Sequence, residues 1–174
     1  RRGPGARGAA RGATMAGGCV GVAGADRTTR PGEGRPHAAG HSPRVGGPNA
    51  AGVQYDRAYG YEIRHVVRDG IQRMYGDDGR DPNVMYYLTV YNEPILQPAE
   101  PENLDVDGVL RGIYLLSAAD GEGPRAQILA SGVAVPWALE AQQLLSQDWG
   151  VRAAVWYVTT RGELRRDGLG AWAG

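Results

Sequence analysis

Residues 126–160, AQILASGVAVPWALEAQQLLSQDWGVRAAVWYVTT, decide the fold class of this protein. They open with a short apolar run at 126–132 and close with another at 153–160, and both are typical of buried strands. Between them, apolar residues recur at helical spacing from about 135 to 148, until Gly150 ends the pattern. Strand, helix and strand joined by short connections make a βαβ unit, which requires a right-handed crossover and a parallel sheet. The sequence therefore predicts an α/β fold.

A second helix and strand precede this unit. With Asp56 as the expected N-cap, apolar residues recur at helical spacing until Gly76, which predicts a helix over about 57–75. The turn-forming segment 77–83 then leads into VMYYLTVY at 84–91, an apolar and β-branched run suited to a strand covered on both faces. A helix that feeds a buried strand is half of an α/β layer.

Composition divides the chain into parts. Gly, Ala, Arg and Pro dominate residues 1–52, which contain hardly any large apolar residue and are expected to be poorly ordered when taken alone. Three prolines and several acids at 93–106 indicate a linker. We therefore expect domain segments at 53–92 and 107–174. The tail of the second segment ends without completing an element that the pattern identifies.

Charge and residue usage exclude several classes of function. The 19 basic and 19 acidic side chains balance, so no overall field favours nucleic acid or an anionic membrane. Every basic residue is arginine, which rules out a Schiff-base lysine and hence a pyridoxal enzyme. Cys19 is alone, so no disulfide can form within the chain, and no apolar run approaches the ~20 residues that span a bilayer. We expect a soluble, cytoplasmic protein.

The glycine-rich loop RTTRPGEGRPHAAGHS at 27–42 carries the first candidate site residues, His37 and His41. Imidazoles titrate near neutrality, so such a loop can move protons or donate a hydrogen bond to a developing oxyanion. Histidines four apart would suit a metal only on a helix, and Pro36 and Gly40 argue against a helix here. The alternative is a glycine-rich loop without function.

Three further stretches each have a functional and a structural interpretation. His65 lies in the predicted helix between arginines, where a solvent-facing or cap-adjacent role is commoner than catalysis. The Tyr-Asn-Glu sequence at 91–93 follows the buried strand, where ligands and interfaces gather in α/β sheets, although a structural turn would also fit. The charged residues near the end suit a solvated face or a docking site: Glu163, Arg165, Arg166 and Asp167.

Taken together and in this order, these stretches resemble the decarboxylating component of the homodimeric bacterial pyruvate dehydrogenase. Residues 27–42 are similar to the RTT-x-x-GEG-x-x-H-x-x-GHS loop of that family, and 69–76 to its DG-x-x-RMYG helix ending. Residues 86–101 resemble its strand and proline linker, and 131–168 follow its SG…DWGV…VWYVT…ELRRDG course. The resemblance covers residues 18–170.

The resemblance implies the end of a thiamine-diphosphate pyrimidine-binding domain, followed by part of a transketolase-type C-terminal βαβ domain. It implies oxidative decarboxylation of pyruvate with thiamine diphosphate and Mg²⁺, by a homodimer that passes the acetyl unit to the lipoyl group of dihydrolipoyl acetyltransferase. The cofactor is the electron sink, and the protein orients it and transfers protons. His37 matches the active-centre loop histidine of the family, and Glu33 and His41 would support that loop.

The chain also departs from the family. Arg35 and Pro36 stand where the family usually has Leu-Gln, and Ala39 replaces an acidic residue. The metal and diphosphate ligands, and the glutamate that activates the aminopyrimidine, have no counterpart in this chain, so we expect it to be inactive alone. Two alternatives stay open: a related thiamine-diphosphate enzyme acting on another 2-oxo acid, and a non-catalytic remnant that serves dimerisation or docking.

Overall fold

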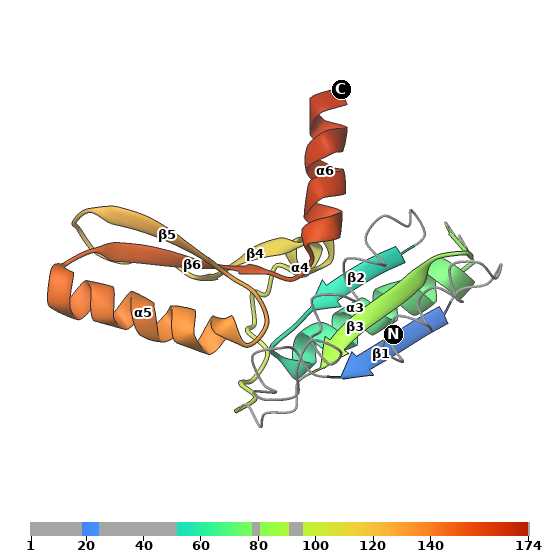
Figure 1. Ribbon diagram of the computed structural model, residues 1–174, viewed down its shortest axis with the longest axis horizontal. Helices are drawn as coiled ribbons and strands as arrows, with labels where there is room; N and C mark the ends of the chain where they lie inside the picture. Colours follow the sequence, from blue (N-terminus) through green and yellow to red (C-terminus); the bar gives the residue numbers. More distant parts are fainter. Residues whose placement is uncertain (1–18, 25–51, 78–80, 91–95, 174) are drawn as a thin grey trace, which may run out of the picture.

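The computed structural model describes residues 19–24, 52–77, 81–90 and 96–173. Over these residues the chain forms two three-stranded sheets that meet at a shared junction (Figure 1). Helices pack on both sheets, so the predicted α/β fold class is confirmed. None of the helices in these ranges is both long and apolar enough to cross a membrane.

The first sheet has the order β1-β3-β2 and is parallel throughout. Its strands are β1 (Cys19–Gly24), β2 (Gly52–Asp56) and β3 (Met85–Val90). The central strand β3 is buried at every residue but its last. This is the strand expected at 84–91, and its position between two neighbours explains the nearly continuous apolar run.

Strand β1 lies inside the segment 1–52, which composition predicts to be poorly ordered when taken alone. All six of these residues pair in register with β3, from Cys19 opposite Met85 to Gly24 opposite Val90. Composition measures what a segment can bury by itself, whereas β1 satisfies its backbone polar groups against a strand that lies about sixty residues later.

Helix α3 (Gly60–Tyr75) begins later than predicted. Asp56 is not its N-cap, because it is the last residue of β2, and the N-cap position belongs to Tyr59. The Tyr59 amide donates to Oε2 of Glu62 at 3.2 Å, so a side chain of the first turn caps the helix. The predicted end is confirmed, since Gly76 follows the last helical residue.

Helix α3 covers the first sheet with an apolar face that includes Val66 and Met74. Gly70 permits this close approach, because a Cβ atom there would lie 3.3 Å from the ring of Tyr86 on β3. The Tyr86 hydroxyl in turn donates to Oδ2 of Asp69 at 2.5 Å. The ring of Tyr86 therefore fills the space beside Gly70, and its hydroxyl has a hydrogen-bond partner at the edge of α3.

The second sheet has the order β4-β6-β5 and contains the predicted βαβ unit. Strand β5 (Arg125–Ala130) and strand β6 (Arg152–Val158) are parallel, and α5 (Ala134–Trp149) connects them. Figure 1 shows α5 running along one face of this sheet. Helix α5 contacts both strands, and Ile128 of β5 and Leu139 of α5 pack against the same hydrophobic core.

Strand β4 (Ile113–Ser117) makes the second sheet mixed rather than wholly parallel, because it pairs antiparallel with β6. It follows a short helix, α4 (Val106–Arg111), that the sequence did not predict. Gly112 joins the two with a φ of +117°, and its amide donates to the Gly108 carbonyl at 2.9 Å. A left-handed residue after a helix allows this sharp reversal into β4.

The tail that was expected to complete no element forms helix α6 (Arg161–Ala173), so that expectation is wrong. The helix begins where the Glu163 amide donates to Oγ1 of Thr160 at 3.3 Å. The Arg166 guanidinium then donates to the Gly52 carbonyl of β2 at 3.1 Å, and the helix projects away from both sheets (Figure 1). Its start is therefore determined by tertiary contacts and not by an apolar periodicity.

The proline-rich segment before α4 lies against the start of α3. Oε1 of Gln97 accepts from the Gly60 amide at 2.7 Å, and the Glu100 carboxylate pairs with Arg64 and, at 2.8 Å, with Nε2 of His65. These contacts lower the pKa of Glu100, chiefly through the hydrogen bond to His65. The segment 96–105 is thus held against α3 by these contacts, although it has no regular secondary structure of its own.

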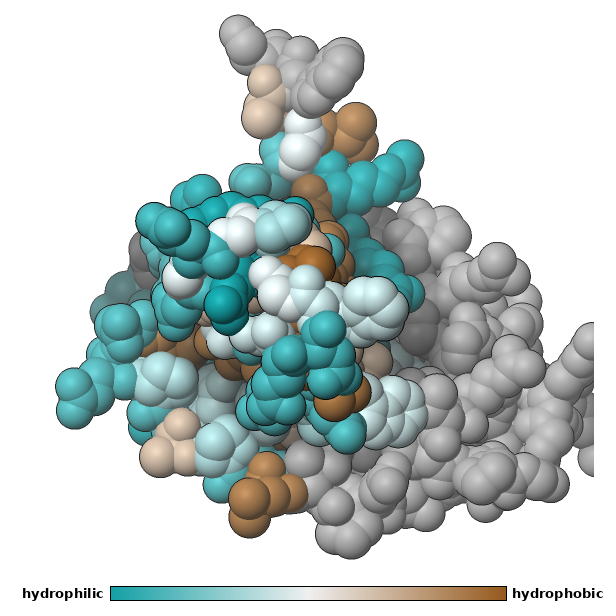
Figure 2. All heavy atoms as spheres, turned by 90° about the vertical axis from the view of Figure 1, so that its left-hand side faces the viewer, coloured by the Kyte–Doolittle hydropathy of each residue, from teal (hydrophilic) through white to brown (hydrophobic). Residues whose placement is uncertain are grey.

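The far end of the second sheet presents mainly hydrophilic residues, with apolar side chains scattered singly (Figure 2). Large apolar side chains are nevertheless exposed on α5, among them Trp137, Leu144 and Trp149. Single exposed apolar residues are normal on protein surfaces. They do not by themselves mark a binding site.

Candidate functional site

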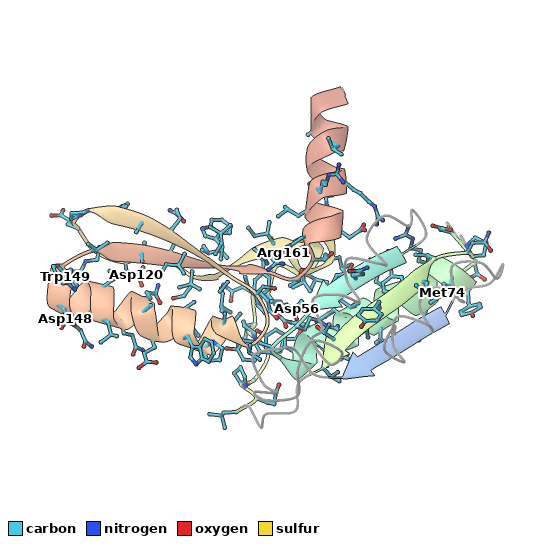
Figure 3. The ribbon with its side chains drawn as sticks, in the orientation of Figure 1. Asp56, Met74, Asp120, Asp148, Trp149 and Arg161 are labelled. Atoms are coloured by element: carbon cyan, nitrogen blue, oxygen red, sulfur yellow. The ribbon has the colours of Figure 1, made fainter. Side chains whose placement is uncertain are left out.

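The carboxyl ends of strands from both sheets meet at Asp56 (Figure 3). Its amide donates to the carbonyl of Thr159, just beyond β6, at 2.8 Å. Its carboxylate accepts from Oγ1 of Thr89 on β3 at 2.7 Å and from Oγ of Ser131, just after β5, at 3.0 Å. Ligands of α/β sheets bind beyond the carboxyl ends of the strands. This junction is therefore the candidate functional site.

Tyrosines from both halves of the chain fill the junction. Tyr157 of β6 is fully buried, and its ring lies 5.5 Å from that of Tyr114 and 6.4 Å from that of Tyr59, measured between centroids. The Tyr157 hydroxyl accepts from the Ala58 amide and donates to the Asp56 carbonyl at 3.2 Å. The backbone between β2 and α3 is thus held by a side chain of the second sheet.

Glu62 is the buried acid of the junction, with no exposed surface. Its Oε1 accepts from the Tyr114 hydroxyl at 2.8 Å, and the Tyr114 hydroxyl lies 3.2 Å from that of Tyr61. Burial raises the pKa of the Glu62 carboxyl to about 7, although hydrogen bonds from Tyr114 and the Tyr59 amide act in the opposite direction. The group can therefore gain or lose a proton near neutral pH.

Arg57 places a cation in the same region. Its side chain is only 2% exposed, and none of its three guanidinium nitrogens has a hydrogen-bond partner within the described part of the chain. The guanidinium carbon lies 5.8 Å from the centroid of the Tyr55 ring, within the range of a cation–π contact. Burial lowers the pKa of Arg57, while nearby groups including Tyr157 and Glu62 raise it.

The junction combines a buried acid, a buried cation and several phenols. The described ranges contain no group of three or more His, Cys, Asp or Glu side chains that could hold a metal ion. A shallow groove of about 460 Å³ lies elsewhere, along the outer face of α3, and is lined by Ile63, Arg64, Val67, Arg68, Ile71 and Gln72.

The raised pKa of Glu62 predicts how stability depends on pH. Between about pH 4.5 and 7 the unfolded chain has released the Glu62 proton while the folded chain retains it, so the free energy of unfolding should fall as pH rises through this window and then level off. Glu62→Gln should remove this fall, because an amide does not ionise. Urea unfolding at pH 5 and pH 8 measures the difference, and Glu140→Gln, at an exposed position of α5, is the matched control. An unchanged pH dependence in Glu62→Gln would contradict the assignment.

The residues predicted from the active-centre loop, Glu33, His37 and His41, lie outside the described residues, as do residues 91–93. Strand β1, which precedes that loop in the chain, ends at Gly24, opposite Val90 at the carboxyl end of β3. Asp56 ends β2 at the same edge, opposite Thr89. Gly24 and Asp56 therefore lie at the same edge of the first sheet.

The other predicted residues have structural contacts. His65 is mostly buried on α3 against Glu100, with 14% of its side chain exposed. Glu163 and Arg166 pair with each other on α6. The structure does not bring either pair into the junction around Asp56.

Sequence reasoning missed Glu62, Arg57, Tyr114 and Tyr157. One signal could have found Glu62, because it shares helical spacing with the apolar residues Tyr59, Ile63 and Val66 and therefore lies on the face of α3 predicted to be buried. A charged residue on an apolar face requires a partner or a shifted pKa. Nothing in the local pattern indicated which distant tyrosines would surround it.

Comparison with known families matches both halves of the chain. Residues 4–98 match the family described as the pyruvate dehydrogenase E1 component middle domain. Residues 112–169 match the transketolase-like TK C-terminal domain. The first match ends and the second begins in the segment between β3 and β4. Asp56 belongs to the first matched region and Tyr157 to the second, so residues of both regions form the junction.

Curated relatives carry the same name across distant bacteria. The chain is 55% identical over 156 residues to the pyruvate dehydrogenase E1 component of Mycolicibacterium smegmatis, and 41% identical over 144 residues to that of Escherichia coli. These matches cover 89% and 82% of this chain. The chain spans only 17% and 16% of the length of these relatives.

Solved structures show the same fold at low identity. The transketolase of Campylobacter jejuni superposes with a TM-score of 0.61 at 16% identity, over 84% of this chain and 21% of that one. A split-gene transketolase, described as an inactive beta4 tetramer, superposes with a TM-score of 0.57 at 14% identity, over 87% of this chain and 43% of that one. Because the first family model covers more than half of the chain, this protein belongs to the family of the pyruvate dehydrogenase E1 component.

Proposed function

We propose that this chain is part of an enzyme that oxidatively decarboxylates pyruvate and transfers the acetyl unit to the lipoyl group of dihydrolipoyl acetyltransferase. The observation that supports the proposal most strongly is the order of the two family matches, with relatives at 41% and 55% identity that carry the pyruvate dehydrogenase name. Thiamine diphosphate would supply the electron sink in the whole enzyme. Mg²⁺, a homodimeric assembly and a location in the cytoplasm belong to the same proposal.

Within that enzyme, we assign His37 to proton transfer or to hydrogen bonding of substrate in the active centre. Glu33 and His41 would hold the loop that presents it. The support is the match of residues 27–42 to the family loop, together with the position of Gly24, the last residue of β1, at the carboxyl edge of the first sheet. Imidazole is the commonest general acid or base near neutral pH.

The domain organisation is part of the proposal. Residues 53–92 would end the pyrimidine-binding domain, 93–106 would link it to the next, and 107–174 would begin the transketolase-type C-terminal domain. The contacts of Gln97 and Glu100 with α3 support a linker that is held in place along the first domain. We further propose that the 174 residues alone do not turn over pyruvate.

A chimaera tests the proposal directly. Residues of this chain would replace the matching 156 residues of the M. smegmatis component, and pyruvate-dependent release of carbon dioxide would be measured with thiamine diphosphate and Mg²⁺. We expect the chimaera to be active, and His37→Ala in it to lower kcat by about 10²- to 10⁴-fold. His65→Ala is the control, because that histidine lies on α3 against Glu100.

Two results would contradict the proposal. One is a chimaera that binds the cofactor and assembles normally but releases no carbon dioxide from pyruvate. That result would show that this chain cannot replace the matching segment of an active enzyme. Turnover of another 2-oxo acid in preference to pyruvate would instead favour a related thiamine-diphosphate enzyme. The isolated chain, assayed in parallel, is expected to release no carbon dioxide.

A further inference from the structure

Arg57 is an unusual feature of the junction, because a buried guanidinium normally has hydrogen-bond partners. Its side chain is 2% exposed, and all three of its nitrogens lack a partner within the described ranges. Leaving a buried donor or charge unsatisfied is costly, and each such group in a folded protein requires an explanation. The contact with the Tyr55 ring compensates only part of that cost.

Glu62 is the acid that can become a partner of Arg57. Its carboxyl group accepts hydrogen bonds from the Tyr114 hydroxyl and the Tyr59 amide, and the Tyr157 hydroxyl also acts on it as a donor. An ionised carboxylate offers about four acceptor sites, so a guanidinium can be added without removing any of these donors. Asp56, whose carboxylate accepts from Thr89 and Ser131, acts less strongly on Arg57 than Glu62 does.

The groups that face Glu62 come from every element packed around it. Tyr59 and Tyr61 belong to the start of α3, Tyr114 to β4 and Tyr157 to β6. These four are phenols, whose own pKa values burial raises where a shift is resolved. On the neighbouring helix α4, the charged Asp107 and Arg111 are exposed. Among the described groups that act on the Glu62 carboxyl, Arg57 is thus the cation.

We infer that Arg57 and Glu62 form a two-position switch at the junction of the two sheets. In the structure the Arg57 guanidinium lies over the ring of Tyr55, and we assign this position to the state in which Glu62 is protonated. When Glu62 releases its proton, the guanidinium moves to the new carboxylate and forms a buried ion pair. The change involves only the transfer of a proton to solvent and the movement of one side chain.

The switch connects the two halves of the chain. In one position Arg57 contacts Tyr55 of β2, whose hydroxyl donates to the Leu110 carbonyl of α4 at 2.9 Å. In the other it contacts the carboxylate that Tyr114 of β4 holds. Protonation of Glu62 therefore changes the contacts between the first sheet and the second. This inference does not depend on the proposed enzymatic function.

Nuclear magnetic resonance of the full 174-residue chain tests the switch. Glutamate labelled with ¹³C at the side-chain carboxyl would follow ionisation from pH 4 to 9, and Glu62→Gln would identify the Glu62 signal. ¹⁵N-labelled arginine would follow the guanidinium of Arg57, identified in Arg57→Lys. We expect the Arg57 signals to change with the same midpoint as the Glu62 carboxyl, and not to change in Glu62→Gln.

A second variant tests the coupling from the other side. Removing the cation in Arg57→Gln should raise the midpoint of the Glu62 titration by about one to three pH units. Asp69→Asn is the matched control, because it neutralises another carboxyl group of α3 that accepts from a tyrosine, Tyr86, outside the junction. Arg57 signals that stay constant while Glu62 titrates would overturn the inference, as would an unchanged midpoint in Arg57→Gln. If Arg57→Gln does not fold, the decision rests on whether the Arg57 signals and the Glu62 carboxyl titrate with the same midpoint in the wild-type chain.

Discussion

Tyr157→Ala is expected to lower the free energy of unfolding by about 3–5 kcal/mol, the range for removing a buried aromatic side chain. Tyr157 has no exposed surface, and its ring contacts those of Tyr59 and Tyr114. The substitution also leaves the Ala58 amide without its acceptor. The loss therefore combines a cavity in the core with an unsatisfied backbone donor between β2 and α3. Urea unfolding followed by circular dichroism measures it.

Two variants separate these contributions. Tyr157→Phe keeps the ring and removes the hydroxyl, so it should cost about 1–3 kcal/mol through the unsatisfied Ala58 amide. Tyr75→Ala is the control for truncating a tyrosine, because Tyr75 is 70% exposed at the end of α3 and should cost less than about 0.5 kcal/mol. Equal effects of Tyr157→Ala and Tyr75→Ala would show that the two sheets do not share a core.

Gly112→Ala is expected to destabilise the chain by about 3 kcal/mol, from left-handed strain together with steric overlap. Gly112 has a φ of +117°, which side chains rarely adopt. An added Cβ would overlap the Thr160 carbonyl oxygen and lie 2.9 Å from the Leu164 amide nitrogen. Both obstacles are backbone atoms at the start of α6, so neither can move aside as a flexible side chain would.

Gly150→Ala is the matched control for that prediction. Gly150 also follows a helix with a positive φ, of +64°, but an added Cβ would meet nothing within 4 Å. Only the conformational cost remains, about 1–2 kcal/mol. Thermal unfolding of both variants measures the difference, which isolates the contact between the α4–β4 turn and α6. Equal losses in the two variants would mean that α6 does not pack against Gly112.

Periodicity was sufficient to predict the elements that bury a regular face. Helix α5 and strands β5 and β6 follow the predicted βαβ pattern, and α3 ends at the predicted Gly76. Each of these elements is long enough for its apolar residues to repeat several times. A short helix such as α4 cannot show a repeat, because its six residues span fewer than two turns.

Helix α6 was missed for a different physical reason. Glycines at 162, 168 and 170 lower its helix propensity, and its exposed residues show no apolar stripe. Its beginning depends on Thr160, Gly112 and the Gly52 carbonyl, which other segments supply. Strand β1 was missed likewise, because its pairing partner β3 is far away in the sequence.

The sequence by itself determined the α/β class, the βαβ unit and the family, because these depend on local periodicity and on motifs that lie within single segments. Only the tertiary structure decided that Asp56, Arg57 and Glu62 meet Tyr114 and Tyr157 at one junction. The raised pKa of Glu62 follows from burial among residues that include Tyr114 and Tyr157, which lie about fifty to one hundred positions away in the sequence. Desolvation and hydrogen bonding are properties of the surrounding packed groups, and no local pattern contains them.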